Sequence, residues 1–132
     1  MNRSSSILSA VLLATACSAA PDALVDTRWV AAEVGGTPAV SGTSSTLEFT
    51  KDGKASGQGG CNRYSGEAKF DHTSLQFGPL AATRMACADP AANGQESRLF
   101  AAFAATHSYR QEGPELVLLD IDGKTLVRFR PE

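Results

Sequence analysis

GGCNRYSG, at residues 59–66, sets one cysteine between closely spaced glycines and a polar Asn-Arg-Tyr cluster. Glycine inside a strand indicates a bulge, a sharp bend or the close approach of another backbone. We therefore expect a strand over residues 55–61 that has one of these features. A second cysteine follows in TRMAC, at residues 83–87, and these two segments hold the only cysteines after residue 20.

Short strands are predicted on both sides of these segments. Apolar and polar side chains alternate over residues 47–50, 67–70 and 125–130, which is the period of half-buried strands. Asp-Gly pairs at residues 52–53 and 122–123 predict type I′ hairpin turns. The chain holds seven or eight such strands, which favours a mainly β protein with one helix, built as a small antiparallel β-barrel that is partly open.

One segment between the strands has the period of a helix. Leucine and phenylalanine at residues 99–103 form an apolar face, padded by alanines. Asn93 is a candidate N-cap with Glu96 three residues later, and Asp89-Pro90 is a competing start one turn earlier. The helix should end at His107 or Ser108. Its apolar face needs a partner surface, so we expect it to cover one end of the barrel.

The N-terminus predicts export and a lipid anchor. Residues 1–16 have one positive charge, a short apolar run and small residues, as in a secretory signal peptide. Cys17 then follows a segment that resembles the lipobox of bacterial lipoproteins, although Ala14 stands where leucine is usual; cleavage at an Ala-x-Ala site is the alternative. Ser18 after the cysteine implies the outer membrane. Residues 17–26 would be a tether and residues 27–131 the folded domain.

Composition limits the partners of the domain. The formal net charge is −2 and the sequence has no basic stripe, so we expect no binding to nucleic acid and no electrostatic attraction to anionic lipid. Attachment to a membrane would come from acylation of Cys17. Stable anchoring needs more than one acyl chain, and the three chains of the lipoprotein pattern would meet that requirement. We expect a monomer that faces the periplasm.

Cys61 and Cys87 allow several forms of chemistry. Three cysteines in an exported protein leave one unpaired, and acylation of Cys17 would leave these two as a pair that can form a disulfide. A redox-active pair is the first alternative, although a Cys-x-x-Cys spacing is absent. A metal site is the second, but it needs four ligands and only His72 and His107 could join the two thiols. Two free buried thiols are the third.

The polar residues beside the cysteines are the candidate binding residues. Asn62, Arg63 and Tyr64 fit a turn in which asparagine takes a left-handed conformation and bonds its own backbone, tyrosine packs its ring and arginine pairs with an acid. They also fit a partner-binding edge, since arginine and tyrosine are favoured at interfaces. Arg84 would join the same surface if the cysteines are bonded, and Arg63 and Arg84 together would suit an anionic group.

Several features occur in a fixed order along the chain: Trp29, GCNRYSG at 60–66, Leu80 with TRMAC at 83–87, a helix around 96–103, LVL at 116–118 and Phe129. This order resembles the META domain family, which includes the HslJ-type heat-shock lipoproteins. The resemblance covers residues 24–130. It implies a lipocalin-like barrel similar to the lipoprotein pilots of secretion systems, an envelope location and no enzyme activity. Members of the family are linked to stress tolerance, envelope integrity, secretion or motility.

These observations lead to one functional expectation and two alternatives. We expect a non-catalytic envelope lipoprotein that acts in stress tolerance and envelope integrity by binding an unknown envelope protein, without a cofactor or a metal. Catalysis lacks support because neither histidine has a nucleophile with an orienting third group nearby in sequence. The alternatives are a lipocalin-like carrier of a small hydrophobic ligand and a secretion-pilot-like protein. A filled interior would favour partner binding, and a hollow one would favour the carrier.

Overall fold

The computed structural model describes residues 23–132, so the predicted signal peptide, Cys17 and most of the predicted tether lie outside the described residues. Residues 23–132 form ten strands and one helix. In chain order these are β1 (Arg28–Val34), β2 (Thr37–Pro38), β3 (Thr46–Phe49), β4 (Lys54–Gln58), β5 (Arg63–Asp71), β6 (Ser74–Phe77), β7 (Ala81–Ala82), α1 (Pro90–Ala105), β8 (Ser108–Glu112), β9 (Glu115–Leu119) and β10 (Thr125–Pro131). Within these residues, no helix is both long enough and apolar enough to cross a membrane.

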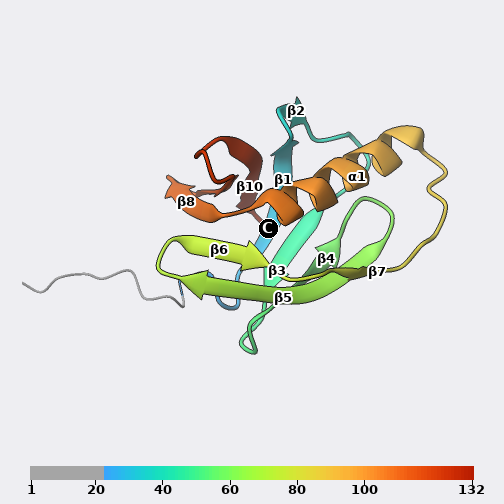
Figure 1. The fold of residues 1–132 in the computed structure, drawn as a ribbon. Helices are drawn as coiled ribbons and strands as arrows, with labels where there is room; N and C mark the ends of the chain where they lie inside the picture. The colour runs from blue at the N-terminus through green and yellow to red at the C-terminus, as the bar shows by residue number, and fades with distance from the viewer. Residues whose placement is uncertain (1–22) are drawn as a thin grey trace, which may run out of the picture.

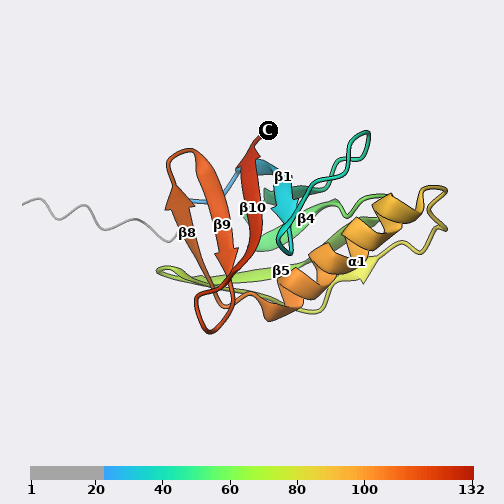
Figure 2. The same cartoon turned by 90° about the horizontal axis from the view of Figure 1, so that it is seen from above.

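Eight of the strands close into an antiparallel ring in the order β1, β3, β4, β5, β6, β8, β9 and β10, with β10 paired back to β1. Figure 2 shows β8, β9, β10 and β1 side by side in this order. The pairing between β6 and β8 is narrow, since only Ser74 and Ser108 are opposite each other. β2 extends β1, and β7 pairs with β5. The predicted fold class, a small and partly open antiparallel barrel with one helix, is confirmed.

The helix α1 packs against β1, β6 and β10, and because β6 lies across the ring from β1 and β10, the helix crosses from one side of the ring to the other (Figure 1). It begins one turn earlier than the Asn93 cap predicts. Asp89 is the N-cap, and its carboxylate accepts the N–H of Ala91 at 2.9 Å. Pro90 occupies the first turn, where a backbone N–H would have no partner within the helix, so its missing N–H costs nothing. The helix ends at Ala105 with Thr106 as the cap, earlier than predicted. Glu96 is therefore not a capping residue.

The interior of the ring is filled by side chains. Phe49 and Phe103 are almost fully buried, and Phe103 packs against Phe77 with 4.7 Å between ring centroids. Other fully or nearly fully buried side chains come from β1, β3, β6, β9, β10 and α1: Trp29, Val34, Leu47, Leu75, Leu99, Leu116, Leu118, Val127 and Phe129. Eight-stranded barrels are just wide enough for such a filling, so this core leaves the ring packed.

The two Asp-Gly turns have a different geometry from the predicted type I′. Gly53 and Gly123 have φ of 76° and 79°, whereas neither Asp52 nor Asp122 is among the non-glycine residues of the described chain with positive φ. In each turn the glycine N–H donates to a carbonyl three residues earlier, that of Thr50 or Asp120. The loop is thus one residue longer than predicted: a type I turn followed by a left-handed glycine.

Of the three features that the glycines of this strand allowed, Gly57 has the close approach of another backbone. A Cβ at this position of β4 would collide with the carbonyl of Thr46 on β3. We expect Gly57→Ala to lower the free energy of unfolding by about 1–3 kcal/mol, because the strands must separate to admit a methyl group. Gly94→Ala is the matched control: it lies in α1 beside the flexible end of Arg98 and should gain about 0.5–1 kcal/mol. Urea denaturation measures the free energy of unfolding of both variants. Equal changes in the two variants would contradict the expectation.

Candidate functional site

Asn62 and Glu96 form the buried centre of the two cysteine-containing segments. Asn62 stands at the bend between β4 and β5 and is 6% exposed, while Glu96 on α1 is 5% exposed. The backbone N–H and the side-chain Nδ2 of Asn62 both donate to the Glu96 carboxylate, at 2.7 and 2.8 Å, and the N–H of Cys61 donates at a longer 3.4 Å. One helical side chain thereby satisfies the backbone of a bend that belongs to the sheet.

The amide oxygen of Asn62 holds the segment before the helix. Its Oδ1 accepts the N–H of Met85 at 2.7 Å and the hydroxyl of Thr83 at 3.0 Å. We call Asn62, Thr83, Met85 and Glu96 the polar clasp, because they join the β4–β5 bend, residues 83–85 and α1. The prediction of a left-handed asparagine that bonds its own backbone is wrong: Asn62 lacks a positive φ, and its side chain bonds residues distant in sequence.

Cys61 and Cys87 are bonded as a disulfide beside the polar clasp, with 5.8 Å between their Cα atoms. This bond attaches the β4–β5 bend to the residues just before α1. Sγ of Cys61 lies 3.6 Å from Oε2 of Glu96. The histidines named as further metal ligands are elsewhere, since His72 is exposed in the β5–β6 turn and His107 is exposed after α1.

Tyr64 is a core residue rather than a surface contact. Its ring packs against Phe100 and Phe103, at 5.5 and 5.3 Å between centroids, and its hydroxyl donates to the carbonyl of Thr46 at 2.6 Å. Burial raises the pKa of this phenol, which therefore stays protonated as a donor. The predicted packing of the tyrosine ring is confirmed.

The two predicted arginines are exposed and lie in different depressions. Arg63 lines one with Ser65 and Thr83, whereas Arg84 lines another with Met85 and Phe100. Within residues 23–132 neither arginine makes an ion pair, so the prediction that Arg63 pairs with an acid is wrong. A shared anion site built from both arginines gains no support from this placement.

Gln95 is a second buried polar residue that the sequence interpretation missed. It is 0% exposed; its Oε1 accepts the N–H of Val40 at 2.6 Å, and its Nε2 donates to Ser45 at 2.7 Å. Gln95 and Glu96 lie four and three residues before Leu99, so they share its buried helix face. This spacing is the sequence feature from which the burial of Gln95 and Glu96 could have been predicted.

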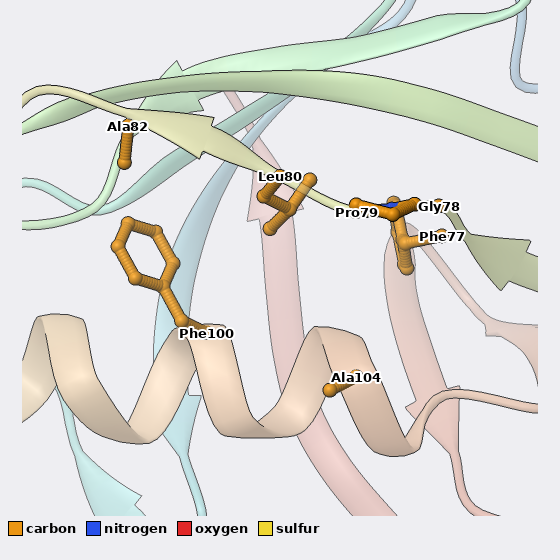
Figure 3. Close-up of a pocket in the computed structure, with 7 residues that line it drawn as sticks. All are labelled: Phe77, Gly78, Pro79, Leu80, Ala82, Phe100 and Ala104. Atoms are coloured by element: carbon orange, nitrogen blue, oxygen red, sulfur yellow. The ribbon is translucent and has the colours of Figure 1, made fainter.

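An apolar groove runs between β7 and α1 (Figure 3). It has a volume of about 450 Å³, and we call it the β7 groove; its lining residues are Phe77, Gly78, Pro79, Leu80, Ala82, Phe100 and Ala104. Figure 3 shows Phe100 directed from the helix toward Leu80 and Ala82. A second depression of about 560 Å³ shares Leu80, Ala82 and Phe100 and continues to Arg84 and Met85, which is 63% exposed.

The β7 groove follows a free strand edge. β6 and β7 lie one after the other along the same edge of β5, where Phe77 is opposite Ala68 and Ala82 is opposite Tyr64. Thr83 donates its N–H to Arg63, so by alternation the N–H and carbonyl of Ala82 point away from β5. Within the described residues β7 pairs with β5 alone. An edge of this kind accepts an added strand.

Comparison with known proteins agrees with this fold. The pattern of the META domain family matches residues 22–132. A protein structure determined by NMR has a TM-score of 0.68 and 27% identity, covering 84% of this chain and 93% of that one. An NMR structure of a protein from Burkholderia xenovorans has a TM-score of 0.67 and 30% identity, covering 87% and 88%.

A more distant structure shares the fold alone. It is the crystal structure of a DUF4847 family protein from Bacteroides vulgatus, with a TM-score of 0.59 and 14% identity, covering 83% of this chain and 95% of that one. No curated protein matches the sequence. Because the family pattern spans every described residue, the chain belongs to the META domain family.

Proposed function

We propose that this protein is a non-catalytic binding module of the bacterial cell envelope, of the HslJ type, which supports stress tolerance and envelope integrity by binding a partner protein. The β7 groove is the observation that carries partner binding. The location, an outer-membrane lipoprotein facing the periplasm, rests on the signal-like residues 1–16 and on Cys17. The absence of catalysis rests on the internal use of the buried polar groups, since Asn62 and Glu96 bond each other.

The proposed occupant of the β7 groove is an extended segment of an envelope protein. A strand added at β7 would pair with the outward N–H and carbonyl of Ala82, and main-chain hydrogen bonds would supply affinity. Its alternate side chains would pack on Phe100 and Leu80, both only partly buried. Arg84 at the adjoining rim lacks an ionic partner in residues 23–132, which favours an acidic residue in the segment.

Two of the residues first considered for binding have a supporting role in this proposal. Asn62 and Tyr64 are buried, so a partner would not contact them directly. Tyr64 supports Phe100, which lines the groove, and Asn62 holds Thr83 and Met85, which line the adjoining depression. The filled ring speaks against a ligand carried inside the barrel, in the manner of a lipocalin. A small hydrophobic molecule in the β7 groove is the competing occupant.

Site-specific photo-crosslinking in living cells tests the occupant. The photoreactive residue is placed at Ala104, which is exposed and lines the β7 groove, and in a matched control at Ala101, which is exposed on α1 but is not among the lining residues. We expect a discrete protein adduct from position 104 and none from position 101. An adduct at 104 that consists of lipid alone would favour the carrier and contradict the proposal.

A proline in β7 then tests the binding mode. Ala82→Pro removes an N–H that points away from β5 and blocks strand addition, so the fold should persist while the crosslink at position 104 is lost. The crosslinked segment is made as a synthetic peptide. Its affinity for Ala82→Pro should fall at least about tenfold, roughly 1.4 kcal/mol. Calorimetry measures this against Ala101→Ser as the control. Equal affinities of the two variants would overturn strand addition.

A further inference from the structure

The hydrogen bonds of the polar clasp do not account for all of the surroundings of Glu96. Its carboxylate is buried and accepts only N–H donors, from Asn62 and Cys61. Within residues 23–132 it has no cationic partner. A buried carboxylate ordinarily pairs with a cation or coordinates a metal. The groups that adjoin it are the two sulfur atoms of Cys61 and Cys87.

The ligand atoms of this cluster are close enough to share one ion. The sulfur atoms of Cys61 and Cys87 and a carboxylate oxygen of Glu96 all lie within 4.8 Å of one another. Zinc binds thiolate at about 2.3 Å and carboxylate at about 2.1 Å, so a tetrahedral ion holds such a pair of ligand atoms roughly 3.5 Å apart. Sγ of Cys61 is already 3.6 Å from Oε2 of Glu96.

We propose that reduction of the Cys61–Cys87 disulfide creates a binding site for a thiophilic divalent cation of the zinc type, with Cys61, Cys87 and Glu96 as ligands. A dithiol reductant gives two electrons and two protons to the disulfide, becomes a disulfide itself, and leaves two cysteine thiols. The cation then displaces both protons and binds the two thiolates and Oε2. Both cysteines are only half-buried, which leaves the fourth position open to water.

Asn62 would position the carboxylate for this role. Its Nδ2 donates to Oε2 at 2.8 Å and its backbone N–H donates to Oε1 at 2.7 Å, which fixes the plane of the Glu96 carboxylate beside the sulfurs. Hydrogen bonds of this kind orient metal ligands and raise affinity. The α-carbons of the cysteines, 5.8 Å apart, belong to two segments that the polar clasp holds together without the disulfide.

Titration of the full chain with Co²⁺ and Zn²⁺ tests the site. After reduction and removal of the reductant, we expect one Co²⁺ per chain, with thiolate-to-cobalt absorption in the near ultraviolet and the visible bands of a tetrahedral ion. Zn²⁺ should displace it. The oxidised protein should show neither signal. A reduced protein that binds less than one ion, or that lacks the thiolate bands, would overturn the proposal.

Three variants separate this site from adventitious binding. The Cys61→Ser/Cys87→Ser variant should lose the thiolate bands. Glu96→Gln should weaken Co²⁺ binding at least about 10–100-fold, the effect expected even for residues that only orient ligands. His107→Ala, which removes an exposed histidine outside the cluster, should bind as the unchanged protein does. Equal affinity of Glu96→Gln and the unchanged protein would show that two free thiols bind the ion without the folded site, and would overturn the proposal.

Discussion

Glu96→Ala is expected to lower the free energy of unfolding by about 2–4 kcal/mol. The change leaves the backbone N–H of Asn62 buried without an acceptor, which costs about 1–3 kcal/mol, and leaves its Nδ2 with the longer hydrogen bond to the Met85 carbonyl, at 3.3 Å. The N–H of Cys61 also loses its acceptor. Urea denaturation followed by the fluorescence of Trp29, which is the single tryptophan, measures the change.

Two further variants give this prediction its control. Glu96→Gln keeps an oxygen that accepts the backbone N–H of Asn62, but it places its amide nitrogen against the Nδ2 of Asn62. The free energy of unfolding should therefore fall by an intermediate amount, about 1–3 kcal/mol. Ser97→Ala, at the next and exposed position of α1, should change stability by no more than about 0.5 kcal/mol. A loss below about 1 kcal/mol in Glu96→Ala would mean that water replaces the carboxylate and that the polar clasp contributes little.

Removal of the disulfide is the second large effect. Cys61→Ser/Cys87→Ser is expected to lower the free energy of unfolding by about 3–4 kcal/mol, because the bond closes a loop across a sequence separation of 26 and restricts the unfolded chain. Chemical denaturation in the presence of a chelator measures this value. The domain should still fold, since its apolar core lies within the ring and does not involve the sulfur atoms.

The reductant provides the control for the disulfide. A phosphine reductant should destabilise the unchanged protein by the same amount and should have no effect on the double serine variant. The N–H of Met85, which donates to Asn62, should still exchange slowly in that variant because the hydrogen bond does not depend on the disulfide. Rapid exchange of this amide together with a loss above about 5 kcal/mol would show that the disulfide, and not the polar clasp, holds residues 83–87.

Much of the fold follows from local sequence patterns. Alternation over residues 67–70 and 125–130 located β5 and β10, because the side-chain period of a strand is visible without knowledge of its partner. Local sequence patterns gave the wrong prediction where a few residues are compatible with two local structures. Asp89-Pro90 prevailed over Asn93 as the helix start, and the Asp-Gly turns took one more residue than type I′ allows.

The candidate site was predictable as a location but not in its contacts. The sequence alone determined the family, the β-rich fold with one helix, and the importance of Cys61, Cys87 and Asn62, because these depend on residue type and order along the chain. Only the tertiary structure decided that Glu96 bonds Asn62, that Tyr64 is buried, and that β7 leaves a free edge beside α1. These features join residues 20 to 40 positions apart, and such pairings depend on how the ring closes and where the helix crosses it, which no local pattern specifies.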